Sequence, residues 1–216
     1  IRRFRNADLP DLVRIWVEHW STAGPPPYVN QAKFEQAVLA RTFFDPETLL
    51  VAESEGSVTG WCHFAPPHCD PSHEDGNVTI VHALCLANSS DDAVALRLLA
   101  AIENAPQSTS RIRIGLVRDD QRGYAGLEPI GFGIGIPLSD YRSNSFLQQG
   151  GYIPGKPHFR MTASVTHYRP PVNRSALQLR RNTQVVCTPI LPKESRVAAS
   201  LGHVDIESAE LEQRGG

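Results

Sequence analysis

The first part of the chain alternates between helical and strand-like spacing of its apolar residues. The stretch 1–5 alternates apolar and basic residues, which predicts a short strand. Helical spacing then predicts a helix whose buried face carries Leu9, Leu12, Val13, Trp16 and Trp20. The helical period resumes over 34–44. Two strand-like runs at 48–54 and 57–65, joined by a turn at Gly56, predict a β-hairpin.

The second part of the chain continues with strands and helices in turn. The segment 77–87 carries few charges and predicts a strand that is central in a sheet. A helix is expected over 92–104, and a strand over 111–117. A short helix at 140–150 precedes a further strand-like run at 156–168. This order predicts an α/β fold, with a mixed sheet and helices on its faces.

The composition changes after Tyr168, where a Pro-Pro break is followed by a basic helical stretch and two strand-like runs at 185–190 and 203–213. A tail of about 50 residues is too short to hold a good core alone. We therefore predict a first domain over 1–168, and a partial module over 169–216 that packs on it or begins a second domain. Because the chain starts at Ile1 inside a strand-like run, we expect the natural protein to continue.

Composition narrows the classes of partner. The chain has 216 residues with 21 Lys and Arg against 23 Asp and Glu, a net charge of −2. This charge gives no electrostatic case for nucleic acid or an anionic membrane as the main partner. The apolar stretch Ala93–Ile102 is interrupted by Arg97 and is shorter than the ~20 residues needed to span a bilayer. Four scattered cysteines fit reduced thiols, so we expect a soluble cytoplasmic protein.

Two segments and the order of elements resemble the GNAT acetyltransferase superfamily. The segments are the opening IRRFRNADLPDLVRIW and the run FLQQGGYIP, in which a short helix ends just before Gly151-Tyr152. A closer resemblance is to bacterial tandem GNAT proteins, carried by GYAGLEPIGFGIGIPLSD and HYRPPVNRSALQLRRNTQ. It implies a GNAT-like mixed, mainly antiparallel sheet flanked by helices over 1–168. It also implies a second, incomplete GNAT-like half beginning in 169–216.

The resemblance further implies acetyl-CoA as a co-substrate. In the family, a Gln/Arg-x-x-Gly-x-Gly/Ala loop opens a helix and holds the pyrophosphate on its backbone N–H groups. The corresponding positions here depart from this pattern except at the last: Ser90, Asp91, Asp92, Ala93, Val94 and Ala95. Two carboxylates stand where the pyrophosphate would arrive, so ordinary helix capping is the competing interpretation.

A GNAT mechanism needs a base for the amine and donors for the acetyl carbonyl. His82 on the central strand and His63 on the preceding strand are the candidate bases, since histidine titrates near pH ~6.5. Buried, hydrogen-bonded histidines are the alternative interpretation, and Glu74 and Asp75 are second choices. The expected carbonyl donors are the backbone N–H groups of the central strand around Leu84, Cys85 and Leu86.

The leaving thiolate also needs a proton. Many family members carry a Tyr four residues before the Gly of the Gly-Tyr pair, but Leu147 holds that position here and cannot donate one. Tyr152 is the candidate acid, with Tyr141 and Tyr124 as the other tyrosines considered. All three are more typical of packing or loop residues.

Two further segments invite other chemistry. The segment CHFAPPHCDPSHED gathers residues that can bind zinc: Cys62, His63, His68, Cys69, Asp70, His73, Glu74 and Asp75. Their spacing is not that of a known zinc finger, so we expect a solvated polar loop and no metal. The Gly-rich segment GFGIGIP lacks both the dinucleotide-binding fingerprint and a P-loop, and is expected to be a surface insert.

Two functional hypotheses follow. In the first, the protein transfers an acetyl group from acetyl-CoA to a small amine acceptor. In the second, it is a catalytically degenerate GNAT-fold half, which senses a ligand or packs on an active partner half or on a second copy. The loop from Ser90 to Ala95 is the feature that separates them.

Overall fold

The computed structural model describes residues 1–41, 44–65, 78–109, 111–115, 124–130, 135–159, 161, 164, 166–167, 169, 172–189 and 207–213. The chain divides into two compact units, Ile1–His158 and Phe159–Gly216. The domain boundary at 168 expected from the sequence stays a prediction.

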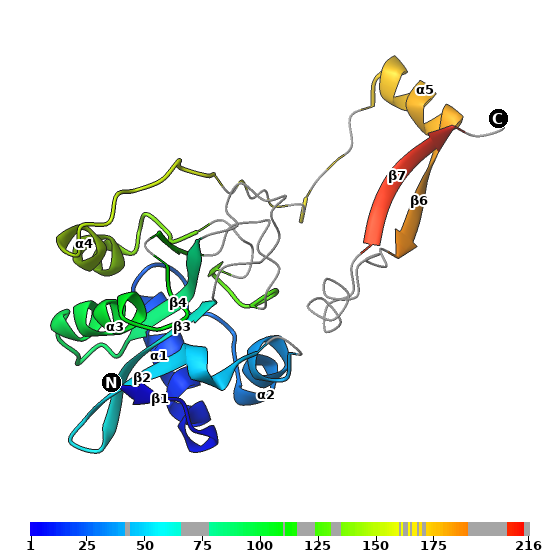
Figure 1. Cartoon of the computed structure of the whole chain (residues 1–216). Helices are drawn as coiled ribbons and strands as arrows, with labels where there is room; N and C mark the ends of the chain where they lie inside the picture. The colour runs from blue at the N-terminus through cyan, green and yellow to red at the C-terminus, as the bar shows by residue number, and fades with distance from the viewer. Residues whose placement is uncertain are drawn as a thin grey trace. The chain divides into compact units, whose positions relative to one another are not determined.

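The first unit is built on one sheet of five strands (Figure 1). In spatial order the strands are β1 (Arg2–Arg3), β2 (Leu49–Ser54), β3 (Ser57–Ala65), β4 (Thr79–Leu86) and β5 (Ile112–Ile114). The first four pair antiparallel with their neighbours, whereas β4 and β5 are parallel. The expected mixed, mainly antiparallel sheet is confirmed.

Helices cover both faces of this sheet. Their bounds are η1 (Asn6–Asp8), α1 (Leu9–Ser21), α2 (Gln31–Phe34), the π-helical η2 (Glu35–Leu39), η3 (Pro46–Thr48), α3 (Ala93–Glu103) and α4 (Tyr141–Gln149). One buried cluster joins α1 and α2 to the sheet, and a second joins α3 and α4 to it. This arrangement agrees with the GNAT architecture that the sequence resemblance implies.

The core on the α1 side is aromatic. Trp16 stacks on both Trp61 and Tyr124, with ring centroids 6.0 and 5.6 Å apart. Tyr124, Leu127 and Ile130 belong to this core although they flank the Gly-rich segment. These three residues precede GFGIGIP, whose residues 131–134 lie outside the described residues, so the expectation of a surface insert stays a prediction for that segment. Tyr124 is a packing residue, and its side chain is buried with those of Leu127 and Ile130.

One predicted strand does not form as expected. The described residues of 156–168 contain no strand, and Phe159 and Met161 are 85% and 94% exposed. A strand needs a neighbour for its backbone groups as well as a suitable composition. Among the described residues, this stretch has none.

The second unit contains α5 (Arg174–Asn182), β6 (Thr183–Pro189) and β7 (Glu207–Gln213). The two strands pair antiparallel in a sheet of their own, so both strand predictions in the tail are confirmed. No residue of α5 is buried. In the part of the chain that the structure describes, no helix is long and apolar enough to cross a membrane.

A partly buried ion pair between Arg2 of β1 and Asp8 of η1 fixes the first strand to the start of α1. Arg2 donates from Nη1 and Nη2 to the two carboxylate oxygens of Asp8, over 2.7 and 2.8 Å. The backbone N–H of Arg5 donates to Asp8 as well, over 2.7 Å. The hydrogen bonds from Arg2 hold the pKa of Asp8 below its usual 3.8, against the opposing effect of burial.

We predict that Asp8→Asn destabilises the protein by about 2 kcal/mol at neutral pH, because a charged hydrogen-bonded pair is lost. A lowered pKa means that the carboxylate stabilises the fold above its ordinary pKa of 3.8 and loses this effect as the pH falls through the lowered value. Urea unfolding across this pH range should show that the difference in the free energy of unfolding between variant and wild type becomes smaller as the pH falls.

The matched control is Asp11→Asn, since Asp11 pairs with Arg14 while its side chain is 43% exposed. Its effect should stay within about 0.5 kcal/mol. An equal loss of unfolding free energy in both variants contradicts the stabilising role assigned to Asp8. So does a loss for Asp8→Asn that does not become smaller at low pH.

Candidate active site

The site begins where two parallel strands part. Among the described residues, the pairing of β4 with β5 ends at Val81 and Ile114, and Gly115 N donates to Val81 O over 2.9 Å. Strand β4 continues to Leu86. In its second half, the backbone groups on the β5 side pair with no described strand, so among the described residues they need other partners.

A β-bulge lies on β4 at this same point. His63 of β3 pairs with Ala83, but the next residue, Phe64, pairs with Val81, so His82 is the extra residue. Bulges re-aim side chains and are common beside active sites. Here the bulge turns the His82 ring toward His63, 5.4 Å away between ring centroids.

Three buried rings form the polar centre of the site. His63 Nδ1 lies 3.0 Å from the Tyr124 hydroxyl, and the His82 ring lies 5.9 Å from the Tyr124 ring at an interplanar angle of 29°. Burial, and then the neighbouring His82, lower the pKa of His63 well below 6.5. Burial, and then the thiols Cys85 and Cys62, raise the pKa of Tyr124 well above 10. His63 and Tyr124 are therefore both neutral at physiological pH.

A small cavity lies at the parting of β4 and β5. The cavity has a volume of about 10 Å³, which is enough for one water molecule. Residues from both strands and both helical layers line it, among them Trp20, His82, Leu84, Ile114, Gly115 and Phe146. Since His82 reaches this cavity and also contacts the other two rings, it connects the cavity to the buried centre.

A histidine from α1 occupies the edge of β4. Leu86 N donates to His19 Nδ1 over 3.3 Å. His19 Nε2 lies 3.2 Å from Ser143 Oγ and 3.2 Å from Asp140 Oδ2, both near the start of α4. Leu84 N–H points to the same side of the strand as Leu86 N–H, because backbone groups of alternate residues share a direction. His19 of α1 thus caps the edge of β4, and Asp140 and Ser143 hold its ring in place.

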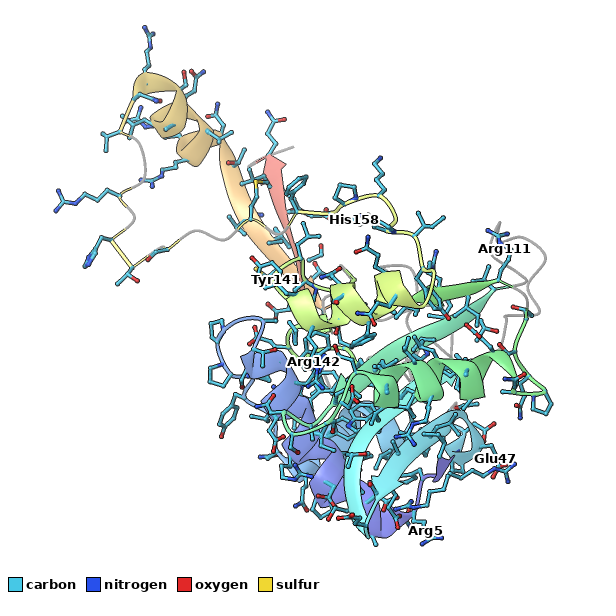
Figure 2. All side chains as sticks on the ribbon, turned by 90° about the vertical axis from the view of Figure 1, so that its left-hand side faces the viewer. Arg5, Glu47, Arg111, Tyr141, Arg142 and His158 are labelled. Carbon is cyan, nitrogen blue, oxygen red and sulfur yellow. The ribbon has the colours of Figure 1, made fainter. Side chains whose placement is uncertain are left out.

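The loop between β4 and α3 is held by Arg142 from α4. Its Nε donates to Asp92 Oδ1 over 2.8 Å and its Nη1 to Ala87 O over 3.0 Å, while its Nη2 donates to Ser90 O. Figure 2 shows Arg142 between α4 and the loop that leads into α3. The guanidinium offsets the charge of Asp92 and fixes the shape of the loop.

Other groups of this loop also have partners within the chain. Asp91 Oδ1 accepts from Ala93 N over 3.1 Å, and Ser90 Oγ donates to Thr59 O over 2.5 Å. Val94 N donates to Asp91 O over 3.0 Å. Asp91 therefore takes one N–H of the first turn of α3, whereas the side chain of the N-cap residue Asp92 makes no capping hydrogen bond.

The remaining expected cofactor residues lie on two structural elements. Leu84, Cys85 and Leu86 form the buried end of β4 and follow the bulge at His82. Ala93 opens α3, and its successors Val94 and Ala95 are buried in the core on the α3 side. These two sets are joined by the loop that Arg142 holds.

The structure does not bring Tyr152 to the histidines. Its hydroxyl donates to Glu103 Oε1 over 2.9 Å, and its ring packs on the core that contains Phe146, on the α3 side of the sheet. Tyr124, which packs with His63 and His82, belongs to the core on the α1 side. The tyrosine that meets the histidines is Tyr124, which precedes the Gly-rich segment.

Most of the expected polar loop lies outside the described residues, including His68, Cys69, Asp70, His73, Glu74 and Asp75. Cys62 is buried in β3, and burial raises the pKa of its thiol. In the described part of the chain, no three metal-ligating side chains come together.

Sequence reasoning missed three residues of the site, His19, Asp140 and Arg142, and it considered Tyr124 only as a possible acid. Their partners are far away in the sequence, so spacing alone does not pair them. One local signal existed for His19, which lies three residues after Trp16 on the apolar face of α1 and is 1% exposed. A buried polar side chain on such a face needs a partner.

Four solved structures, among them the following three, are similar to this chain at low sequence identity. A mutant of the BH1408 protein from Bacillus halodurans is 14% identical, over 76% of this chain and 98% of that one, with a TM-score of 0.49. A probable acetyltransferase is 14% identical over 77% and 98%, with a TM-score of 0.42. The loading GNATL domain of CurA from Lyngbya majuscula is 16% identical over 67% and 81%, with a TM-score of 0.39.

No family model matches the chain, and no curated protein sequence matches it either. Because the structural likenesses are weak in sequence and in superposition, we take the chemistry of the site from this chain's own residues.

We predict that Arg142→Gln lowers the free energy of unfolding by about 1–3 kcal/mol, because hydrogen bonds from a charged donor are lost. It should also speed amide hydrogen exchange at the start of α3, around Ala93 and Val94. Arg97→Gln is the matched control, since Arg97 is an exposed arginine of α3. Unchanged exchange at the start of α3 in Arg142→Gln contradicts the assignment of Arg142 as the residue that holds the loop.

Proposed function

We propose that the unit Ile1–His158 is an acetyltransferase of the GNAT type, which transfers an acetyl group from acetyl-CoA to a small amine. One observation carries the proposal: His82, the bulged residue of β4, reaches the cavity where β4 and β5 part. This places an imidazole beside the strand edge at which the resemblance puts the thioester.

In this proposal His82 is the base. It accepts a proton from the incoming amine, whose nitrogen forms a bond to the acetyl carbon while the carbon–sulfur bond breaks. The N–H groups of Leu84 and Leu86 face the same side of β4 and would donate to the carbonyl oxygen as its charge develops. Because Leu147 cannot donate a proton, the leaving thiolate takes its proton from water.

The chain's own groups fit acetyl-CoA in part. The edge of β4 offers donors, although His19 holds Leu86 N–H and must be displaced from it. At the start of α3, the carboxylate of Asp91 takes the N–H of Ala93, where a diphosphate would bind. Arg142 offsets only one of the two neighbouring carboxylates, that of Asp92. We therefore expect weak binding of the cofactor.

The second candidate function is a non-catalytic half that packs on an active partner. The loop before α3 favours it, because Asp91 already takes the N–H of Ala93, one of the groups that would hold a diphosphate. The two candidates differ in one measurable respect, which is whether acetyl-CoA binds.

We predict a saturable rise in Tm when acetyl-CoA is added up to millimolar concentration. A ligand at ~100 times its Kd stabilises a protein by ~2.7 kcal/mol. For a chain of this size the corresponding shift is roughly 5–10 °C. Asp91→Asn should increase the shift at equal ligand concentration, because it removes the negative charge near the diphosphate that Arg142 does not offset. Absence of any shift in both proteins favours the non-catalytic half.

Turnover tests the role of His82 in the same preparation. With an amine acceptor found by screening, His82→Gln should lower kcat by about 10²–10⁴-fold while the acetyl-CoA shift is retained. His158→Gln is the control, since His158 is exposed at the end of the unit (Figure 2). Full activity of a folded His82→Gln variant contradicts the assignment of the base.

A further inference from the structure

Tyr124 is held rigidly at the buried centre of the site. It follows β5 in the chain, its backbone has a φ of 62°, and its N–H donates to Ala37 O over 3.2 Å. A bulky residue with positive φ is uncommon, so its surroundings must hold it there. Its ring lies flat on Trp16 at 16°, and is fully buried. The packing therefore fixes where the hydroxyl points.

The hydroxyl of Tyr124 meets one histidine while the ring meets the other. Among the described residues, His63 Nδ1 is the hydrogen-bond partner of the hydroxyl, at 3.0 Å. The same ring lies over His82 at 29°. One side chain from outside the sheet thus contacts histidines on two neighbouring strands.

The direction of this hydrogen bond follows from chemistry. Both groups are neutral, because burial raises the pKa of Tyr124 and lowers that of His63. If His63 Nδ1 carried the proton and donated it, the hydroxyl proton would need a second acceptor in a fully buried place, or would remain unsatisfied at a cost. If the hydroxyl donates to Nδ1, the hydroxyl proton has its acceptor and the His63 proton lies on Nε2.

We propose that Tyr124 is a positioning residue for the histidine pair: its hydroxyl donates to His63 Nδ1 and fixes the His63 proton on Nε2, while its ring holds His82 against the cavity. The consequence for catalysis rests on the proposed function. Donation to Nδ1 favours the neutral form of His63. His82 can then accept a proton without facing a second positive ring 5.4 Å away.

The test measures the protonation of each ring nitrogen directly. The full chain, labelled with ¹⁵N in its histidines, is examined at neutral pH by long-range ¹H–¹⁵N correlation, and His63→Gln and His82→Gln assign the signals. We expect an unprotonated Nδ1 and a protonated Nε2 for His63 in the wild type. In Tyr124→Phe the tautomer ratio of His63 should change roughly fivefold, the equivalent of one ordinary hydrogen bond. The His82 signals should shift as well.

Tyr152→Phe is the matched control. It also removes a hydrogen-bonded tyrosine hydroxyl, but that hydroxyl donates to Glu103 on the α3 side of the sheet. It should leave the signals of both histidines unchanged. A protonated Nδ1 in wild-type His63 overturns the proposal, and so do unchanged His63 signals in a folded Tyr124→Phe variant. If Tyr124→Phe does not fold, the protonation of His63 Nδ1 in the wild-type spectrum alone supports or overturns the proposal.

Turnover separates this proposal from the one on which it rests. Where acetyl transfer is detected, Tyr124→Phe should lower kcat and leave KM for the amine unchanged. Expected ring signals without any acetyl transfer overturn the proposed enzyme activity, while they support the placement of the His63 proton by Tyr124.

Discussion

The end of the pairing between β4 and β5 is the constraint on which the rest of the site depends. Beyond Val81 and Ile114, no described strand pairs with this edge of β4, so among the described residues its backbone groups need other partners. His19 from α1 supplies one of these partners at Leu86, and the start of α4 fixes that imidazole in turn through Asp140 and Ser143. The parting of two strands thus determines how α1 and α4 meet.

The bulge at His82 gives this edge its chemistry. The bulge lies on β4, one residue after the pairing with β5 ends. Because of it, the His82 ring lines the cavity and packs with His63, which it would not do on a regular strand. The cofactor side is less well prepared. Arg142 of α4 and Asp91 already bind groups of the loop before α3, so the proposed affinity for acetyl-CoA is weak. The proposed base, His82, is well placed.

Local patterns in the sequence predicted what local patterns determine. The strongly apolar run that became β4, the hairpin of β2 and β3, and the amphipathic α1 and α3 all formed as predicted, because burial of one face or both explains their composition. The stretch around Phe159 has a strand-like composition but no described partner strand. The contact of Tyr124 with His63, and that of Arg142 with Asp92, join segments far apart in the chain and leave no mark in the spacing of residues.

We propose that the edge of β4 and the start of α3 form one site for the thioester cofactor. The most direct measurement is a titration of the ¹⁵N-labelled protein with acetyl-CoA, followed through backbone amide signals. Acetyl-CoA is expected to cause saturable shifts at Leu84, Leu86 and Ala93, accompanied by a change in the ring signals of His19 as it leaves Leu86 N–H. Shifts confined to other parts of the chain, or no shifts at millimolar ligand, would contradict it.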